Sequence, residues 1–107
     1  MRTIRVGPLP ERALEAAAQF HARVLPELIR PRADEDLVLI FDPAPYDHRG
    51  WRLAAIQDLA RAAAPVRVNG VAGDDEAAIA EALAYLRGAS GVTGQLLAVD
   101  GNAGDKG

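Results

Sequence analysis

The sequence contains no cysteine, a single lysine and only five aromatic residues, and these shortages exclude several classes of protein. Without cysteine the chain has no disulfide framework, no thiolate nucleophile and no cysteine-ligated zinc or iron–sulfur site. No apolar run approaches the roughly 18 residues that a membrane-spanning helix needs, and the N-terminus lacks the apolar stretch of a signal peptide. We therefore expect a cytoplasmic protein that makes no contact with a membrane.

The charge balance is mildly acidic, which argues against a nucleic-acid partner. Twelve Lys plus Arg stand against 15 Asp plus Glu, a formal net charge of −3. Binding to phosphates needs a clustered basic face, whereas the arginines are scattered from Arg2 to Arg87. A length of 107 residues allows one small domain. We place this domain at 1–100 and expect the polar segment 101–107 to be a flexible tail.

Four strand-type runs alternate with three helix-type segments along the chain. The expected strands are 3–6, 37–41, 66–71 and 96–99, and the expected helices are 10–30, 49–63 and 74–88. Pro26 should kink or shorten the first helix, whereas Asp74 as N-cap and Gly88 as terminator bound the third. The order β-α-β-α-β-α-β predicts an α/β fold with a small, parallel, four-stranded Rossmann-like sheet.

The expected helix 49–63 is apolar on two sides, so something must cover both. A sheet of four strands also leaves an exposed edge and uncovered helix surface, and oligomerisation usually removes such surface. We therefore expect a homodimer, in which the apolar residues divide between the sheet and the partner. Aromatic residues are common anchors at interfaces. The candidates for the interface are Trp51, Ala55, Leu59 and Leu25.

Two stretches resemble the short-chain dehydrogenase/reductase family. The first, at 58–73, reads DLARAAAPVRVNGVAG and is similar to the family's helix ending in Ala-Pro, followed by the strand IRVNAVAPG. The second, at 76–102, reads EAAIAEALAYLRGASGVTGQLLAVDGN and is similar to the family's last helix and its closing VTGQVLAVDGG. LVLIF at 37–41 falls where the family has a strand, so the whole chain resembles the C-terminal half of such an enzyme.

The resemblance implies a Rossmann-like fold, but several functional parts of the family have no counterpart in this chain. The family's glycine-rich turn and its coenzyme selector belong to the N-terminal half, so we expect no cofactor. Where the family has its catalytic Ser, the strand ends in Phe41-Asp42, and the family's Tyr-x-x-x-Lys pair falls at Pro45 and Arg49. Arginine is never deprotonated in proteins, so it cannot relay a proton as the lysine does.

Four residues remain as candidates for residual chemistry: Asp42, Tyr46, Arg49 and Asn69. Asp42 follows a strand at its carboxyl end, where α/β proteins place functional groups. Asn69 has a structural alternative, in which its side chain caps neighbouring backbone groups. We expect a non-catalytic dehydrogenase-like domain that acts through self-association or through contacts with a full-length relative. The alternative is a small-molecule or nucleotide-binding module with a residual oxidoreductase role beside a partner.

Overall fold

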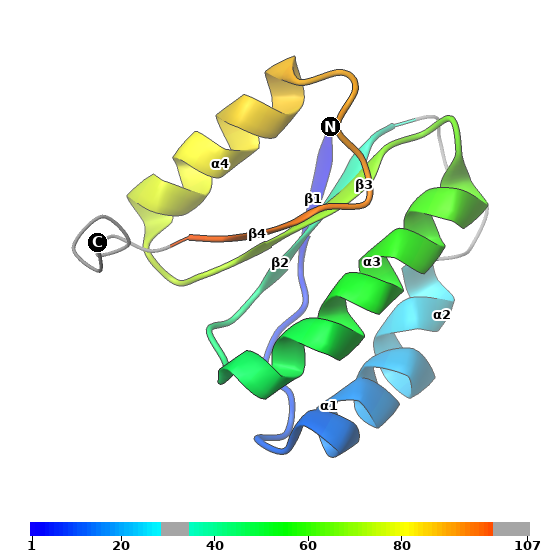
Figure 1. Ribbon diagram of the computed structural model, residues 1–107, viewed down its shortest axis with the longest axis vertical. Helices are drawn as coiled ribbons and strands as arrows, with labels where there is room; N and C mark the ends of the chain where they lie inside the picture. The colour runs from blue at the N-terminus through cyan, green and yellow to red at the C-terminus, as the bar shows by residue number, and fades with distance from the viewer. Residues whose placement is uncertain (29–34, 100–107) are drawn as a thin grey trace.

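The strands form a single parallel sheet in the order β1-β2-β3-β4, as the alternation of strands and helices predicts. The computed structural model describes residues 1–28 and 35–99 (Figure 1). The strands are β1 (Arg2–Arg5), β2 (Leu37–Phe41), β3 (Val68–Ala72) and β4 (Leu96–Ala98). The fold is the expected α/β Rossmann-like arrangement. The expected tail, 101–107, lies outside the described residues.

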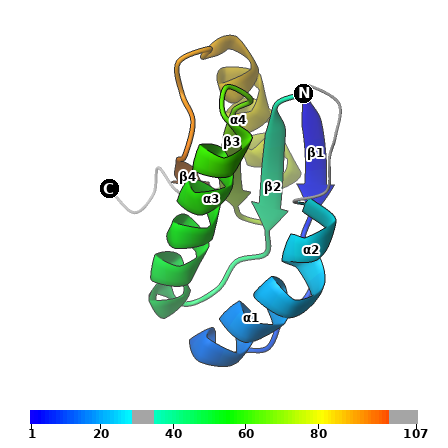
Figure 2. The same cartoon turned by 90° about the vertical axis from the view of Figure 1, so that its right-hand side faces the viewer.

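Helices cover both faces of this sheet (Figures 1 and 2). One face carries a helical segment made of α1 (Ala13–Gln19), the π-helical turn η1 (Phe20–Val24) and α2 (Leu25–Leu28), with α3 (Arg49–Ala63) beside it. A short 3₁₀ turn, η2 (Tyr46–His48), leads into α3. The other face carries α4 (Glu76–Gly88). The sheet is therefore the middle layer of three.

Strand β2 lies at the centre of the core because all five of its residues are buried. Successive side chains of a strand point to opposite faces. Accordingly, Leu37, Leu39 and Phe41 join the cluster under α1 and α3, whereas Val38 and Ile40 join the cluster under α4. The continuous apolar run LVLIF thus has the environment that its lack of alternation predicts.

The first helical segment is interrupted just before its proline, where a kink or shortening was predicted. Pro26 has no N–H to donate to the carbonyl of Ala22. The chain widens over η1, and the N–H of Leu25 donates to the carbonyl of Phe20, five residues earlier. Widened turns of this kind are a recognised cause of helix distortion. Phe20, the first residue of this turn, is fully buried in the core.

The N-cap of α4 is Asp75, so the prediction of Asp74 is wrong by one residue. A carboxylate of Asp75 accepts a hydrogen bond of 2.8 Å from the N–H of Ala78, which is the third helical position. Asp74 is exposed in the turn before the helix. The expected terminator, Gly88, is the last helical residue, and Ala89 is the C-cap. The sequence offers two adjacent aspartates, and the backbone geometry selects the second.

Gly73 provides a test of the packing between β3 and β4. Its N–H donates to the carbonyl of Phe41 at 3.0 Å, and a Cβ here would overlap the carbonyl oxygen of Val99. We expect Gly73→Ala to lower the free energy of unfolding by about 2–3 kcal/mol, measured by urea denaturation. Gly50→Ala is the matched control, because its Cβ meets no atom within 4 Å and helix propensity favours alanine. Equal stability of the two variants would contradict this close approach.

Candidate functional site

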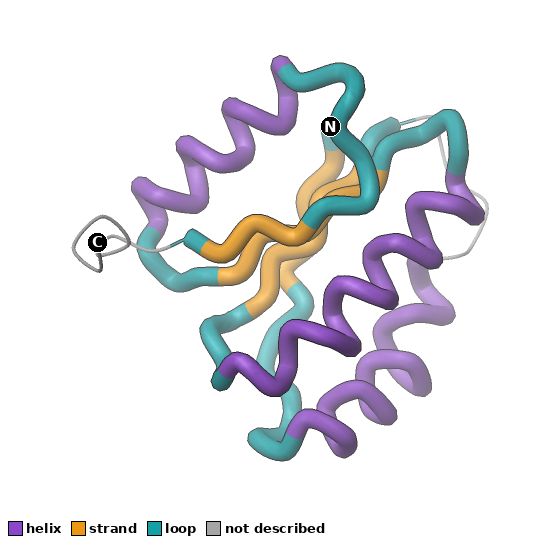
Figure 3. The backbone as a smooth tube through the Cα atoms, in the orientation of Figure 1, coloured by secondary structure: helices purple, strands orange, loops and turns teal. Residues whose placement is uncertain are grey.

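A cavity of about 910 Å³ opens at the carboxyl ends of β1 and β2. Two loops form it, the one that leads from β1 into α1 and the one that leads from β2 into α3; both lie at the lower end of the molecule in Figure 3. In parallel α/β sheets, ligands bind outside the carboxyl ends of the strands. The chain therefore has a cavity where this architecture favours a binding site. Its lining runs over 7–14, 42–45, 47, 48 and 52.

Arg52 is the buried charged residue of this cavity. Only 7% of the residue is exposed, and its Nε has no hydrogen-bond partner. Its guanidinium lies over the ring of Phe41 at 4.7 Å and near the ring of Trp51 at 5.8 Å. Burial lowers the pKa of the Arg52 guanidinium from its ordinary value, and the charge of Asp42 opposes this shift. Contact with aromatic faces compensates only in part for the water that the cation has lost.

His48 closes the inner wall of the cavity and uses both of its ring nitrogens in doing so. Nδ1 accepts a hydrogen bond of 3.3 Å from the indole N–H of Trp51, which can only donate. Nε2 must then carry the proton, and it donates to the carbonyl of Glu11 at 2.8 Å. His48 therefore ties the β1–α1 loop to the start of α3. It has no ring N–H left for a ligand.

The residues proposed for residual chemistry are not brought together. Asp42 lines the cavity, but Tyr46 is 84% exposed on η2 and is not part of the lining. Arg49 is exposed and lines a separate groove beside α4 and β4. A proton relay needs its groups within hydrogen-bond reach of one reacting atom. Asp42, Tyr46 and Arg49 therefore do not share one site.

Asn69 has the structural role that the alternative interpretation gave it. The residue is 2% exposed in β3. Its amide nitrogen donates to the carbonyl of Val92 at 3.0 Å, and its amide oxygen accepts from the N–H of Gln95 at 3.0 Å. Both bonds hold the loop that connects α4 to β4. A side chain whose polar atoms are occupied in this way has little capacity to bind a substrate.

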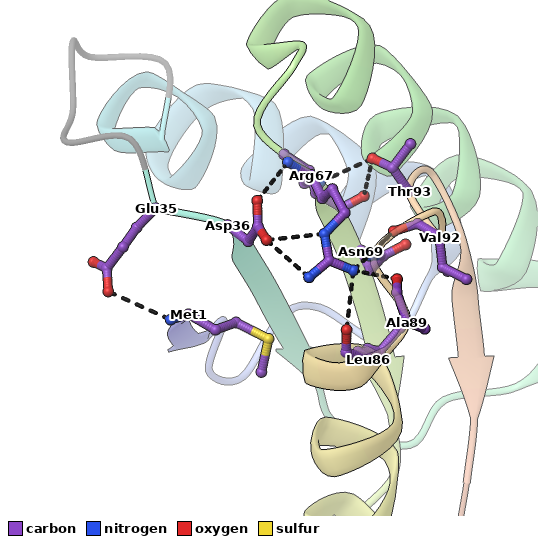
Figure 4. Close-up of polar contacts among 10 residues, drawn as sticks. Met1, Glu35, Asp36, Arg67, Asn69, Leu86, Ala89, Val92 and Thr93 are labelled. Carbon is purple, nitrogen blue, oxygen red and sulfur yellow. Dashed lines mark hydrogen bonds and ion pairs between the residues drawn. The ribbon is translucent and has the colours of Figure 1, made fainter.

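Arg67, two residues before Asn69, is the hub of the polar network in Figure 4. Its backbone N–H and its Nε each donate to the Asp36 carboxylate at 2.9 Å. Its Nη1 donates to the carbonyls of Leu86, Ala89 and Val92. This one guanidinium joins the start of β2, the end of α4 and the loop before β4. Arg67 escaped the sequence analysis, although it belongs to the RVN motif quoted there.

Two of the predicted interface residues pack inside the chain itself. Ala55 is 3% exposed and Leu59 is 6% exposed, and both belong to the core cluster under α1 and α3. Trp51 is half-buried, with ring centroids 5.3 Å from Phe20 and 6.0 Å from Phe41. Leu25 is half-buried against the same cluster. The chain's own first helical segment thus covers much of the second apolar side of α3, which was expected to need a partner.

Comparison with known proteins agrees with this architecture. A family model described as "Short chain dehydrogenase-like protein" matches residues 4–99. The chain belongs to this short chain dehydrogenase-like family. No curated protein and no solved structure matches the chain significantly. The match begins within β1 and ends at the residue after β4, so it includes the other three strands and the helices between them.

In this short chain dehydrogenase-like chain, the residues that match the family's motifs most closely are the structural ones. Arg67 and Asn69 of the RVN motif hold backbone in place. The positions that the resemblance assigns to the catalytic tyrosine and lysine hold Pro45 and Arg49. Family membership therefore accounts for the scaffold. It does not by itself assign an activity.

Two further site properties follow from the described part of the chain. Over residues 1–28 and 35–99, no three His, Cys, Asp or Glu side chains lie close enough together to hold a metal ion. No helix in the same ranges is long and apolar enough to span a membrane. The cavity residue that sequence reasoning missed is Arg52, which is buried and has an unpartnered Nε. Its only sequence signal is a charge placed among the apolar positions of α3.

The Asp36–Arg67 pair predicts how stability depends on pH. The N–H of Arg67 is the main cause that holds the pKa of the Asp36 carboxyl below its ordinary 3.8, burial opposes it, and the guanidinium lowers it further. A lowered folded-state pKa stabilises the fold above the unfolded-state pKa, and this contribution is lost as pH falls through the folded-state value. We expect Asp36→Asn to cost about 1–2 kcal/mol at pH 7 in urea denaturation.

The difference between wild type and Asp36→Asn should shrink as the pH falls below about 4, because the wild-type carboxylate then becomes protonated. Asp58→Asn is the matched control, since Asp58 pairs with Arg61 but both side chains are largely exposed. Its cost should stay within about 0.5 kcal/mol. A cost for Asp36→Asn that is constant from pH 7 to pH 2.5 would contradict the linkage.

Proposed function

We propose that this short chain dehydrogenase-like domain is non-catalytic and acts through contacts with another protein chain, in the first place a second copy of itself. The non-catalytic part rests on which residues occupy the positions that the resemblance assigns to the family's catalytic tyrosine and lysine. Pro45 has no ionisable group, and the neighbouring Tyr46 is exposed outside the cavity. Without a tyrosine near a lysine, no group can exchange a proton with a substrate oxygen as that family does.

The proposed self-association rests on an apolar stripe that the single chain leaves uncovered. Four residues spaced by four positions along the first helical segment are all exposed: Leu14, Ala18, Ala22 and Pro26. Residues four apart lie on one face of a helix. The segment and α3 form a two-helix layer on the sheet (Figure 2), so an equivalent layer from a second copy could cover the stripe. A full-length relative with the same helices is the other partner that this stripe would fit.

The alternative function is that of a small-molecule or nucleotide-binding module with a residual oxidoreductase role beside a partner. It differs from the proposal in requiring contacts between coenzyme and this chain. The cavity at the carboxyl edge favours binding of some small molecule. Coenzyme binding is therefore tested separately from self-association.

We expect NADH and NADPH at 1 mM to leave the melting temperature of the purified chain unchanged. A coenzyme at ten times its Kd would contribute about 1.4 kcal/mol and raise the melting temperature of a domain of this size by several degrees. An active short-chain dehydrogenase in the same fluorimetry assay is the positive control. A clear upward shift, or oxidation of NADPH in the presence of a carbonyl compound, would contradict the non-catalytic proposal.

For self-association, we expect sedimentation velocity to show a dimer whose population rises with concentration. Ala18→Lys should weaken dimerisation at least about ten-fold, because it places a charge on the apolar stripe. Ala80→Lys is the matched control, since Ala80 is an exposed helical alanine on the opposite face of the sheet. A monomer at every concentration, or equal effects of the two variants, would overturn the proposed contact.

A further inference from the structure

We infer that the cavity at the carboxyl ends of β1 and β2 binds a small monocarboxylate with an apolar body, whose carboxylate pairs with Arg52. This inference goes beyond the proposed function, because it depends neither on self-association nor on any reaction. It also stands apart from the coenzyme. Its basis is the charge of Arg52, which the chain buries and leaves without an accepting oxygen.

Arg52 has lost most of its hydration without gaining an acceptor. The residue is 7% exposed, its Nε is sealed from solvent, and none of the described residues accepts a hydrogen bond from it. A buried cation without a partner destabilises a fold, and contacts with aromatic rings offset only part of that cost. The faces of Phe41 and Trp51 position the guanidinium but do not accept its hydrogen bonds. An oxyanion in the cavity would supply the acceptor that these contacts do not provide.

The oxyanion has to come from a ligand in the cavity, because the neighbouring carboxylate of Asp42 does not pair with Arg52. The charge of Asp42 acts on Arg52, yet the two side chains form no ion pair within 4.0 Å. Arg52 lines the cavity, so its guanidinium can be approached from that side. A carboxylate matches the planar fork of a guanidinium with two parallel hydrogen bonds.

The other charges of the cavity favour a ligand with one negative charge. Its lining contains three carboxylates, those of Glu11, Asp42 and Asp47, against the guanidinium groups of Arg12 and Arg52. A phosphate dianion would meet repulsion from these carboxylates, whereas a single carboxylate seated at Arg52 meets less. His48 adds no donor, because both of its ring nitrogens are occupied.

The remaining lining requires an apolar ligand body. Between the two loops, the walls are formed by prolines, alanines and leucines, among them Pro8, Leu9 and Pro43. Such walls bury hydrocarbon favourably and offer few hydrogen bonds. A short aliphatic or alicyclic carboxylate therefore fits both parts of the site, the charged floor and the apolar walls.

Binding can be followed by the fluorescence of Trp51, the only tryptophan of the chain, whose ring lies 5.8 Å from the Arg52 guanidinium. We expect hexanoate to change this fluorescence saturably and to raise the melting temperature, whereas hexanamide, the uncharged isostere, does neither at the same concentration. Inorganic phosphate should bind more weakly than hexanoate. An equal response to hexanamide, tighter binding of phosphate, or no response to hexanoate would each overturn the inference.

Two arginine variants on the same helix locate the effect. Arg52→Met should weaken hexanoate binding at least about ten-fold, the loss expected for a charge-assisted pair, and should raise the melting temperature of the free protein. Arg49→Met is the matched control, because Arg49 is exposed and lies outside this cavity, and it should bind as wild type. If Arg52→Met fails to fold, Arg52→Lys keeps the charge without the fork and should still weaken binding. Unchanged affinity in the Arg52 variant that folds would overturn the site.

Discussion

The constraint on which the structure depends most is the closure of the amino edge of the sheet around Arg67. One side chain there satisfies a carboxylate before β2 and three carbonyls at the end of α4 and in the loop that follows it. Without these bonds, the last turn of α4 and the path into β4 would expose backbone acceptors to a partly buried region. Asn69, two residues further along the chain, continues the same network into the sheet. The layer of α4 is thus attached to the sheet by polar bonds as well as by apolar packing.

The opposite edge of the sheet contains an arginine in the reverse situation. Arg67 is nearly buried and its guanidinium is saturated with acceptors, whereas Arg52 is buried and has none among the described residues. Both residues are arginines, and the difference between them lies in the hydrogen-bond acceptors that surround each guanidinium. Saturation makes Arg67 a structural element, because removing it would leave several acceptors unpaired. Lack of an acceptor on the protein is the feature of Arg52 from which we infer an anion site, since sites that bind ligands often cost a fold some stability.

The sequence predicted those features of the fold that depend on the regular spacing of apolar residues, and it predicted other features less well. The parallel sheet and the buried run LVLIF follow from side-chain spacing, and both appear in the structure. The kink or shortening predicted at Pro26 takes the form of a π-helical turn just before it, and the helix continues through the proline. The choice between Asp74 and Asp75 could not be made from spacing, since both suit an N-cap. The second apolar side of α3 was read correctly as needing a cover, but the cover of Ala55 and Leu59 is the chain's own first helical segment. Sequence periodicity identifies a buried face without identifying what buries it.

The candidate site was harder to predict because it depends on an unmet interaction. Asp42 could be anticipated at the carboxyl edge from the general rule for parallel sheets. Arg52 could not, because nothing in a sequence shows whether a guanidinium will find acceptors.

The same distinction explains why membership of the short chain dehydrogenase-like family carries so little functional content here. Arg67 and Asn69, in the most recognisable motif, serve the scaffold, and a scaffold can be retained while the residues at the carboxyl edge change. Pro45, at the position that the resemblance assigns to the family's tyrosine, has no ionisable group, and this supports the proposal of a non-catalytic domain. What the edge retains is a cavity, apolar walls and one unpaired cation. Those features suit binding, and binding places no demand on the catalytic positions.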